Sequence, residues 1–172
     1  MNTPVFGITG WKNSGKTTLT ERLVAHLVAL GLRVSTVKHA HHAFDIDKAG
    51  TDSFRHRAAG ASEVAIVSGQ RFAIMHELRE EPEPELTEIL ARLAPCDLVL
   101  IEGYKRENHP KIEVRRLGAR SVEPLAPNDP SILAIAADSP QNAGNLPVFG
   151  LDDIAGIAAF ILSTTGLDRR RD

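Results

Sequence analysis

A glycine-rich segment near the start of the chain has the residue types and spacing that bind a phosphate chain. Residues 10–17, Gly-Trp-Lys-Asn-Ser-Gly-Lys-Thr, fit the pattern G-x-x-x-x-G-K-[ST] and lie between an apolar run and a helical pattern. The glycines let the backbone N–H groups face the phosphates, Lys16 reaches the β and γ oxygens, and the Thr17 hydroxyl can ligate Mg²⁺. The helix that follows adds the positive end of its dipole. The segment therefore predicts a nucleotide-binding phosphate loop.

Polar residues also follow three other predicted strands. In an open parallel sheet, ligands collect at the carboxyl ends of the strands, so these residues are expected to converge with the phosphate loop. They are Lys38, His39, His41 and His42 after a strand at 33–38, Glu102 after a strand at 97–101, and Asp138 after a strand at 132–137.

Two carboxylates are candidates for metal binding or catalysis beside the loop. Glu102 follows the apolar run Leu98-Val99-Leu100-Ile101, as an acidic Walker B residue does, where a carboxylate helps to hold Mg²⁺. Its alternative role is to cap Gly103 or to pair with Lys105. Asp52 lies between the loop and Glu102, where it either faces the metal and orients water or caps the helix that follows.

The histidine segment leaves three interpretations open. Imidazole is a common transition-metal ligand, and Asp45 and Asp47 are close in sequence, but no nearby cysteine completes a tetrahedral set. The alternatives are contacts to phosphate or to an anionic second substrate, and simple packing of the loop.

The sequence gives little direct information on the nucleotide base. The guanine-specifying pattern N-K-x-D is absent. Asp138 could still pair with guanine N1–H and N2–H₂, because a carboxylate offers two acceptors to those two donors, or it could cap the end of its strand. Trp11 stands where the dimeric ATPases that use a lysine in trans have that lysine, so Lys12 is not expected to act in this way.

The hydrophobic pattern predicts an α/β P-loop NTPase fold, with a mostly parallel, helix-covered sheet and an added antiparallel strand pair. The pair is a hairpin of strands at 63–67 and 72–76. Residues 111–115 alternate apolar and charged side chains, which indicates a half-exposed strand near an edge. We expect a single domain over residues 1–165 and a disordered tail at 166–172. Further expected elements are strands at 5–9 and 147–149 and helices at about 19–30, 54–59, 86–93 and 152–162.

Composition restricts the class of partner. The 172 residues carry a formal net charge of −2, which does not favour nucleic acid or an anionic membrane surface. Cys96 is the lone cysteine and cannot form an internal disulfide, which suits a reducing compartment. No stretch approaches the roughly 20 apolar residues needed to span a bilayer. We expect a soluble cytoplasmic protein that binds neither nucleic acid nor membrane.

Several segments form a recognisable combination: residues 10–18, 37–42 (VKHAHH), 45–47 (DID), 50–53 (GTDS), 57–61 (RAAGA) and 100–105 (LIEGYK). Together they resemble the MobB family of molybdopterin-guanine dinucleotide biosynthesis adaptor proteins, over about residues 5–160. Thr51 departs from the family, which commonly has lysine there, and so does Ala49, where proline is frequent.

The resemblance implies a GTP-binding, Mg²⁺-dependent adaptor with weak intrinsic GTPase activity. Such proteins are usually homodimeric and assist MobA, the guanylyltransferase that joins GMP to molybdopterin, and a molybdoenzyme or molybdopterin itself is a further candidate partner. Lys16, Asp52 and Glu102 are then the candidates for catalysis, Thr17 and Glu102 for the metal, and Asp138 for the base. The residues expected at the phosphates are Gly10, Lys12, Asn13, Ser14, Gly15, Lys16, Thr17 and Thr18.

Two alternative functions share the phosphate loop. A metallochaperone-type GTPase would use His39, His41 and His42 as metal ligands. A small-molecule P-loop kinase would transfer the γ-phosphoryl group, although the sequence lacks an evident arginine-rich lid.

Overall fold

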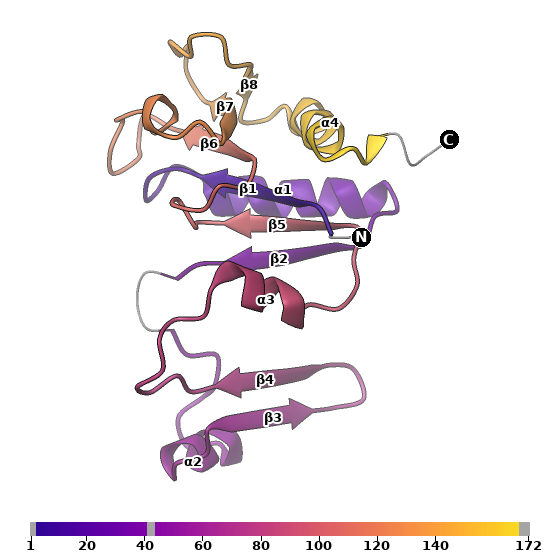
Figure 1. Ribbon diagram of the computed structural model, residues 1–172, viewed down its shortest axis with the longest axis vertical. Helices are drawn as coiled ribbons and strands as arrows, with labels where there is room; N and C mark the ends of the chain where they lie inside the picture. Colours follow the sequence, from indigo (N-terminus) through magenta and orange to yellow (C-terminus); the bar gives the residue numbers. More distant parts are fainter. Residues whose placement is uncertain (1–2, 41–43, 169–172) are drawn as a thin grey trace. The chain divides into compact units, whose positions relative to one another are not determined.

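A six-stranded, wholly parallel sheet carries the phosphate loop (Figure 1). Because all strands run in one direction, their carboxyl ends meet at one edge of the sheet, as the sequence predicted. The strands, in their order across the sheet, are β2 (Val34–Lys38), β5 (Leu98–Glu102), β1 (Val5–Thr9), β6 (Lys111–Arg115), β7 (Ile132–Ala137) and β8 (Val148–Gly150).

Helices α1 (Lys16–Ala29) and α4 (Ile154–Thr165) pack against this sheet and against each other. The predicted helical spacing of leucines explains why α1 forms there, because Leu19, Leu23 and Leu27 lie on one face and are all buried. They belong to one hydrophobic core with apolar side chains of β1, β5, β6, β7 and α4. This core fixes the start of α1 next to the end of β1.

The structure is a computed structural model that describes residues 3–40 and 44–168. Contacts group the chain into two units, residues 1–39 with 93–172, which contain the parallel sheet, and residues 40–92. The single domain over residues 1–165 stays a prediction. No helix within the described ranges is long and apolar enough to cross a membrane.

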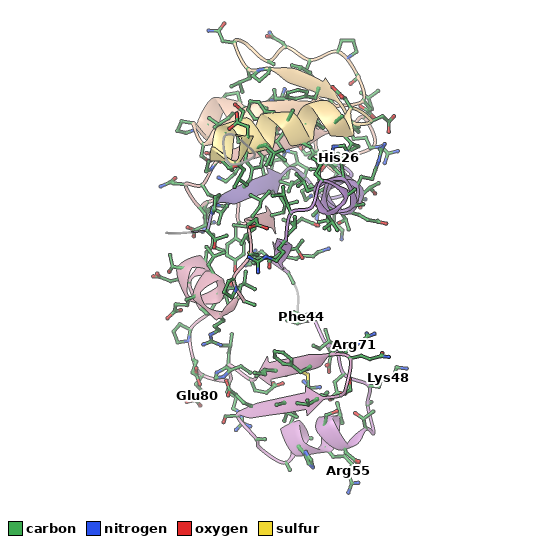
Figure 2. The ribbon with its side chains drawn as sticks, turned by 90° about the vertical axis from the view of Figure 1, so that its right-hand side faces the viewer. His26, Phe44, Lys48, Arg55, Arg71 and Glu80 are labelled. Carbon is green, nitrogen blue, oxygen red and sulfur yellow. The ribbon has the colours of Figure 1, made fainter. Side chains whose placement is uncertain are left out.

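The second unit contains helices α2 (Asp52–Ala58) and α3 (Leu86–Arg92) and the antiparallel hairpin of β3 (Glu63–Val67) and β4 (Phe72–His76). In Figure 2 Arg71 lies at the turn of this hairpin, and Arg55 points away from α2. The parallel sheet and the separate antiparallel pair confirm the predicted fold class.

The end of the first unit differs from the expectation. Gly166 terminates α4 in the left-handed conformation, and Leu167 is buried in the hydrophobic core. The segment that we expected to be disordered from residue 166 is therefore ordered as far as Leu167. Residues 169–172 lie outside the described residues.

Strand β6 is the clearest correction to the sequence analysis. We expected a half-exposed strand near an edge, but β6 lies between β1 and β7, and the side chains of Lys111 and Glu113 are 0% and 1% exposed. The alternation of charged and apolar residues was misleading because both faces of this strand are buried, one of them among charged groups.

The buried charges of β6 are paired and hydrogen-bonded. Lys111 Nζ lies 2.8 Å from Asp129 Oδ2, which lowers the Asp129 pKa although burial opposes this. Glu113 accepts hydrogen bonds from the backbone N–H groups of Leu125 at 2.8 Å and Ala126 at 3.0 Å, and from Arg115 at 2.8 Å. Ion pairs and hydrogen bonds of this kind are what make buried charge tolerable. These contacts anchor the connection between β6 and β7 to the sheet.

We predict that Glu113→Gln lowers the free energy of unfolding by about 3 kcal/mol, measured by urea denaturation. The amide places a donor where backbone N–H groups need acceptors, and it leaves Arg115 buried without its counter-charge. Glu107→Gln, at an exposed position in the same unit, is the matched control and should change stability little. Equal stability of the two variants would show that Glu113 does not anchor this connection.

Candidate functional site

The phosphate loop joins the end of β1 to the start of α1. Gly10 has φ +144°, and a Cβ at this position would lie 2.5 Å from the carbonyl oxygen of Val114, so only glycine fits. Asn13 takes a left-handed φ of 66°, which asparagine tolerates. Gly15 is the N-cap of α1 and no side chain caps the helix. The first-turn N–H groups of α1 thus lack a side-chain acceptor, which is the arrangement that binds anions.

Lys16 lies at the centre of this loop. Its Nζ donates a hydrogen bond to the carbonyl oxygen of Trp11 at 2.7 Å. Burial lowers the pKa of Lys16, the Glu102 carboxylate raises it, and the nearby charges of Lys105 and Lys38 lower it further. An anion at the loop would relieve this repulsion, so the electrostatics around Lys16 favour a bound phosphate.

Thr17 and Glu102 are brought together as the sequence predicted. Thr17 Oγ1 donates a hydrogen bond to Glu102 Oε1 at 2.9 Å, and the same oxygen lies 3.4 Å from Lys38 Nζ. A hydroxyl and a carboxylate are oxygen ligands of the kind that Mg²⁺ prefers. The chemistry and closeness of these two side chains therefore fit the predicted metal position.

His39 lies directly beside Glu102. Its backbone N–H donates to the carbonyl oxygen of Glu102 at 2.9 Å, and its ring lies 4.7 Å from that of Tyr104. Gly103 has φ +99°, and a Cβ there would lie 3.0 Å from His39 Cβ, which explains why glycine follows Glu102. In residues 3–40 and 44–168, no group of three or more His, Cys, Asp or Glu could hold a metal ion. His41 and His42 lie outside the described residues.

Two cavities adjoin the loop. A cavity of about 330 Å³ lies at the phosphate loop, and one of about 470 Å³ extends from α1 to the ends of β7 and β8. Gly15, Thr18 and Arg116 line both, so the cavities are neighbours. The first cavity is lined by the residues predicted to bind phosphates, and the second is large enough to continue it toward Asp138.

Asp138 lines the larger cavity. Both of its carboxylate oxygens face the backbone N–H of Leu117, at 3.3 and 3.4 Å, which agrees with the predicted role at a strand end. Its side chain is partly exposed, and it also faces Arg116. The second predicted role, contact with a base, is compatible with this position in the cavity.

Asp52 lies in the second unit, at the first position of α2. The helix is capped by Thr51, whose side chain accepts a hydrogen bond from Phe54 N–H, so the interpretation of Asp52 as the N-cap is wrong. Its carboxylate is 90% exposed and lies 3.8 Å from Arg55 Nη1. A role for Asp52 at the metal stays a prediction.

The D-x-D motif of the second unit is structural. Arg57 pairs with Asp45 at 2.9 Å and with Glu77 at 2.7 Å, and its Nε lies 3.6 Å from Asp47. Burial opposes ionisation of Asp47, but hydrogen bonds from Thr51 and Ser53 lower its pKa overall. The motif thus fixes the chain that leads into α2.

Sequence analysis missed a set of contacts around Trp11. Trp11 Nε1 donates to the carbonyl oxygen of Glu123 at 2.7 Å, and the carbonyl oxygen of Lys12 accepts from Arg120 N–H at 2.9 Å. Lys105 Nζ lies 4.0 Å from the centre of the Trp11 ring. The β6–β7 connection thus supports the phosphate loop. A prediction of β6 next to β1 inside the sheet would have indicated that the connection after β6 lies beside the phosphate loop.

Comparison with known proteins gives one consistent result. Residues 5–138 match the family model described as MobB, molybdopterin guanine dinucleotide synthesis protein B. The chain is 36% identical to the molybdopterin-guanine dinucleotide biosynthesis adapter protein of Escherichia coli K12, covering 92% of this chain and 91% of the relative. It is 40% identical to the adapter protein of the same name from Haemophilus influenzae, covering 92% and 87%.

Solved structures agree with the sequence comparison. The crystal structure of a MobB protein homolog from Bacillus stearothermophilus matches with a TM-score of 0.70 at 31% identity, covering 97% of this chain and 99% of that one. A crystal structure of molybdopterin-guanine biosynthesis protein B matches with a TM-score of 0.73 at 30% identity, covering 94% and 99%. The likeness includes both the parallel sheet and the second unit.

Proposed function

The chain belongs to the MobB family of molybdopterin-guanine dinucleotide biosynthesis adapter proteins, and from this premise we propose that it binds GTP with Mg²⁺ in order to act. The observation that supports this most strongly is the hydrogen bond of 2.9 Å between Thr17 and Glu102 beside the uncapped start of α1. It joins the two oxygen groups that a nucleotide-bound Mg²⁺ requires.

Different groups of the phosphate loop would bind different oxygens of the phosphate chain. Lys16 would exchange its hydrogen bond with Trp11 for one with a β or γ oxygen, because a phosphate offers a full negative charge in place of a carbonyl dipole. Backbone N–H groups from Asn13 to Thr18 would hold the remaining oxygens. Mg²⁺, when bound between Thr17 and Glu102, would supply positive charge to the phosphates.

Asp138 is the proposed contact of the base. It lines the larger cavity, which shares Gly15 and Thr18 with the phosphate cavity. Its two oxygens match the two donors of guanine and would repel the acceptor N1 of adenine. The weak contact with Leu117 N–H would be retained or exchanged at little cost, since both distances exceed 3.2 Å.

As an adapter, the chain would act through other proteins of the pathway. We propose that bound GTP and Mg²⁺ change the surface around Lys38 and His39 and that this surface engages MobA or a molybdoenzyme, with molybdopterin as a further candidate ligand. Lys38 and His39 support this because they contact Glu102 directly. Slow intrinsic GTP hydrolysis would then end the interaction. We propose that the protein acts in the cytoplasm.

The hairpin supports the proposal of a homodimer. Side chains of paired residues lie on one face of a hairpin. Val64 and Met75 are buried on one face, whereas Val67, Phe72 and Ile74 on the other are 75%, 71% and 60% exposed. A two-stranded sheet with an exposed apolar face is marginal alone and typical of an interface. We propose that this face, defined by Val67, Phe72 and Ile74, meets the same face of a second copy.

We predict that calorimetry with Mg²⁺ will show tighter binding of GTP than of ATP and that Asp138→Asn will remove this preference, lowering GTP affinity at least about tenfold. Asp152→Asn is the matched control, because Asp152 lines the same cavity and pairs with Arg22.

Lys16→Ala should remove most affinity for both nucleotides. Unchanged GTP affinity in Lys16→Ala would contradict the assignment of the loop.

The dimer is tested by sedimentation equilibrium. The wild-type chain should be dimeric, and Phe72→Glu with Ile74→Glu should dissociate it by placing charge on the apolar face. Val28→Glu, at an exposed apolar position of α1, should leave the dimer intact. A monomeric wild type, or an intact dimer in the double variant, would exclude this interface.

A further inference from the structure

Arg116 is a charged residue at the site that the assignments above leave without a role. It directly follows β6 and lines both the phosphate cavity and the larger cavity. Its guanidinium Nε lies 3.8 Å from Asp138 Oδ2, and its side chain is 57% exposed. Arg116 therefore stands between the proposed positions of the phosphates and the base.

The backbone at Arg116 is held in place from several directions. Its carbonyl oxygen accepts a hydrogen bond from Ala119 N–H at 3.0 Å, and the next N–H, of Leu117, faces Asp138. On the other side, Arg115 pairs with the buried Glu113 at 2.8 Å. The chain thus fixes where the Arg116 side chain begins, while its exposed guanidinium keeps the freedom to change partner.

The pair between Arg116 and Asp138 is weak enough to be exchanged. An exposed ion pair with single-point geometry contributes little to stability, since water competes for both charges. A phosphate offers a guanidinium two oxygens and a bidentate geometry, which a carboxylate at 3.8 Å does not provide. A phosphate in the cavity would therefore draw Arg116 away from Asp138.

The cavity walls indicate which phosphate is within reach. Lys16 and Thr17 line only the phosphate cavity, whereas Gly15, Thr18 and Arg116 line both cavities. Lys16 serves the β and γ oxygens in a phosphate loop of this pattern. The phosphate that lies toward the larger cavity, and so toward the base, is the α-phosphate.

We propose that Arg116 binds the α-phosphate of the guanine nucleotide and in doing so releases Asp138 to contact the base. The inference rests on the proposed function and deepens it. Without a phosphate as partner, Arg116 faces Asp138. A ligand with both a phosphate and a guanine separates the two side chains, because the phosphate binds Arg116 and the guanine binds Asp138. Guanosine has no phosphate, so it must bind an Asp138 that still faces Arg116. Arg116 thus couples phosphate recognition to base selectivity.

The test measures the affinities of GTP, GDP, GMP and guanosine for the full chain by calorimetry, with NMR titration for the weaker ligands. Arg116→Ala should weaken GTP, GDP and GMP by a similar factor, about tenfold or more, and should leave guanosine affinity equal or higher. Arg116→Lys should restore part of the lost affinity, because lysine keeps the positive charge but cannot bind a phosphate through two parallel hydrogen bonds as a guanidinium does.

Arg33→Ala is the matched control. Arg33 is also exposed, and its Nε lies 3.7 Å from Asp97 at the opposite edge of the same sheet. This variant should bind all four ligands as the wild type does, and thermal unfolding should show that both alanine variants are folded.

Three results would overturn the inference: wild-type affinities in Arg116→Ala, a loss confined to GTP, or an equal loss for guanosine. Each of these would leave the proposed function standing so long as the wild type binds GTP in preference to ATP. Failure of the wild type to bind GTP would instead remove the proposed function.

Discussion

The hydrogen bond between Thr17 and Glu102 is the constraint on which the rest of the site depends. It joins residues 85 positions apart in the chain, the start of α1 and the end of β5. The parallel register places Glu102 next to Ile8, one residue before the end of β1, so the loop and the carboxylate must meet. Lys38 reaches the same carboxylate from β2. The sheet thus brings together the groups that we propose bind the phosphates and Mg²⁺.

The second constraint is the charge buried in β6. A core made only of apolar side chains would give equal or greater stability, because burying ions is costly. Here the buried Glu113 holds two backbone N–H groups of the connection to β7. That connection reaches the phosphate loop at Trp11 and Lys12. The charges of β6 therefore hold the connection that contacts the phosphate loop, which an apolar strand could not do.

The parts that were predictable from sequence are those that depend on local pattern. The phosphate loop, the apolar strand before Glu102 and the hairpin follow from spacing and periodicity, and all were found where expected. The position of β6 was missed because alternation describes the exposure of one face, whereas the partners of Lys111 and Glu113 come from a later connection. Arg116 was overlooked for the same reason. The cap of α2 could be assigned only from the structure, because N-cap propensity favours aspartate over threonine whereas Thr51 is the residue that caps the helix.

The central claim, that Thr17 and Glu102 form the metal position of a GTP site, is tested most directly by the Mg²⁺ dependence of GTP binding. Calorimetry of the wild type and of Glu102→Gln, each with Mg²⁺ and with EDTA, isolates the contribution of the metal. The account predicts that the two proteins bind GTP with similar affinity in EDTA. It also predicts that the gain in GTP affinity caused by Mg²⁺ is at least about tenfold larger in the wild type than in Glu102→Gln. An equal Mg²⁺ effect in both proteins would contradict it.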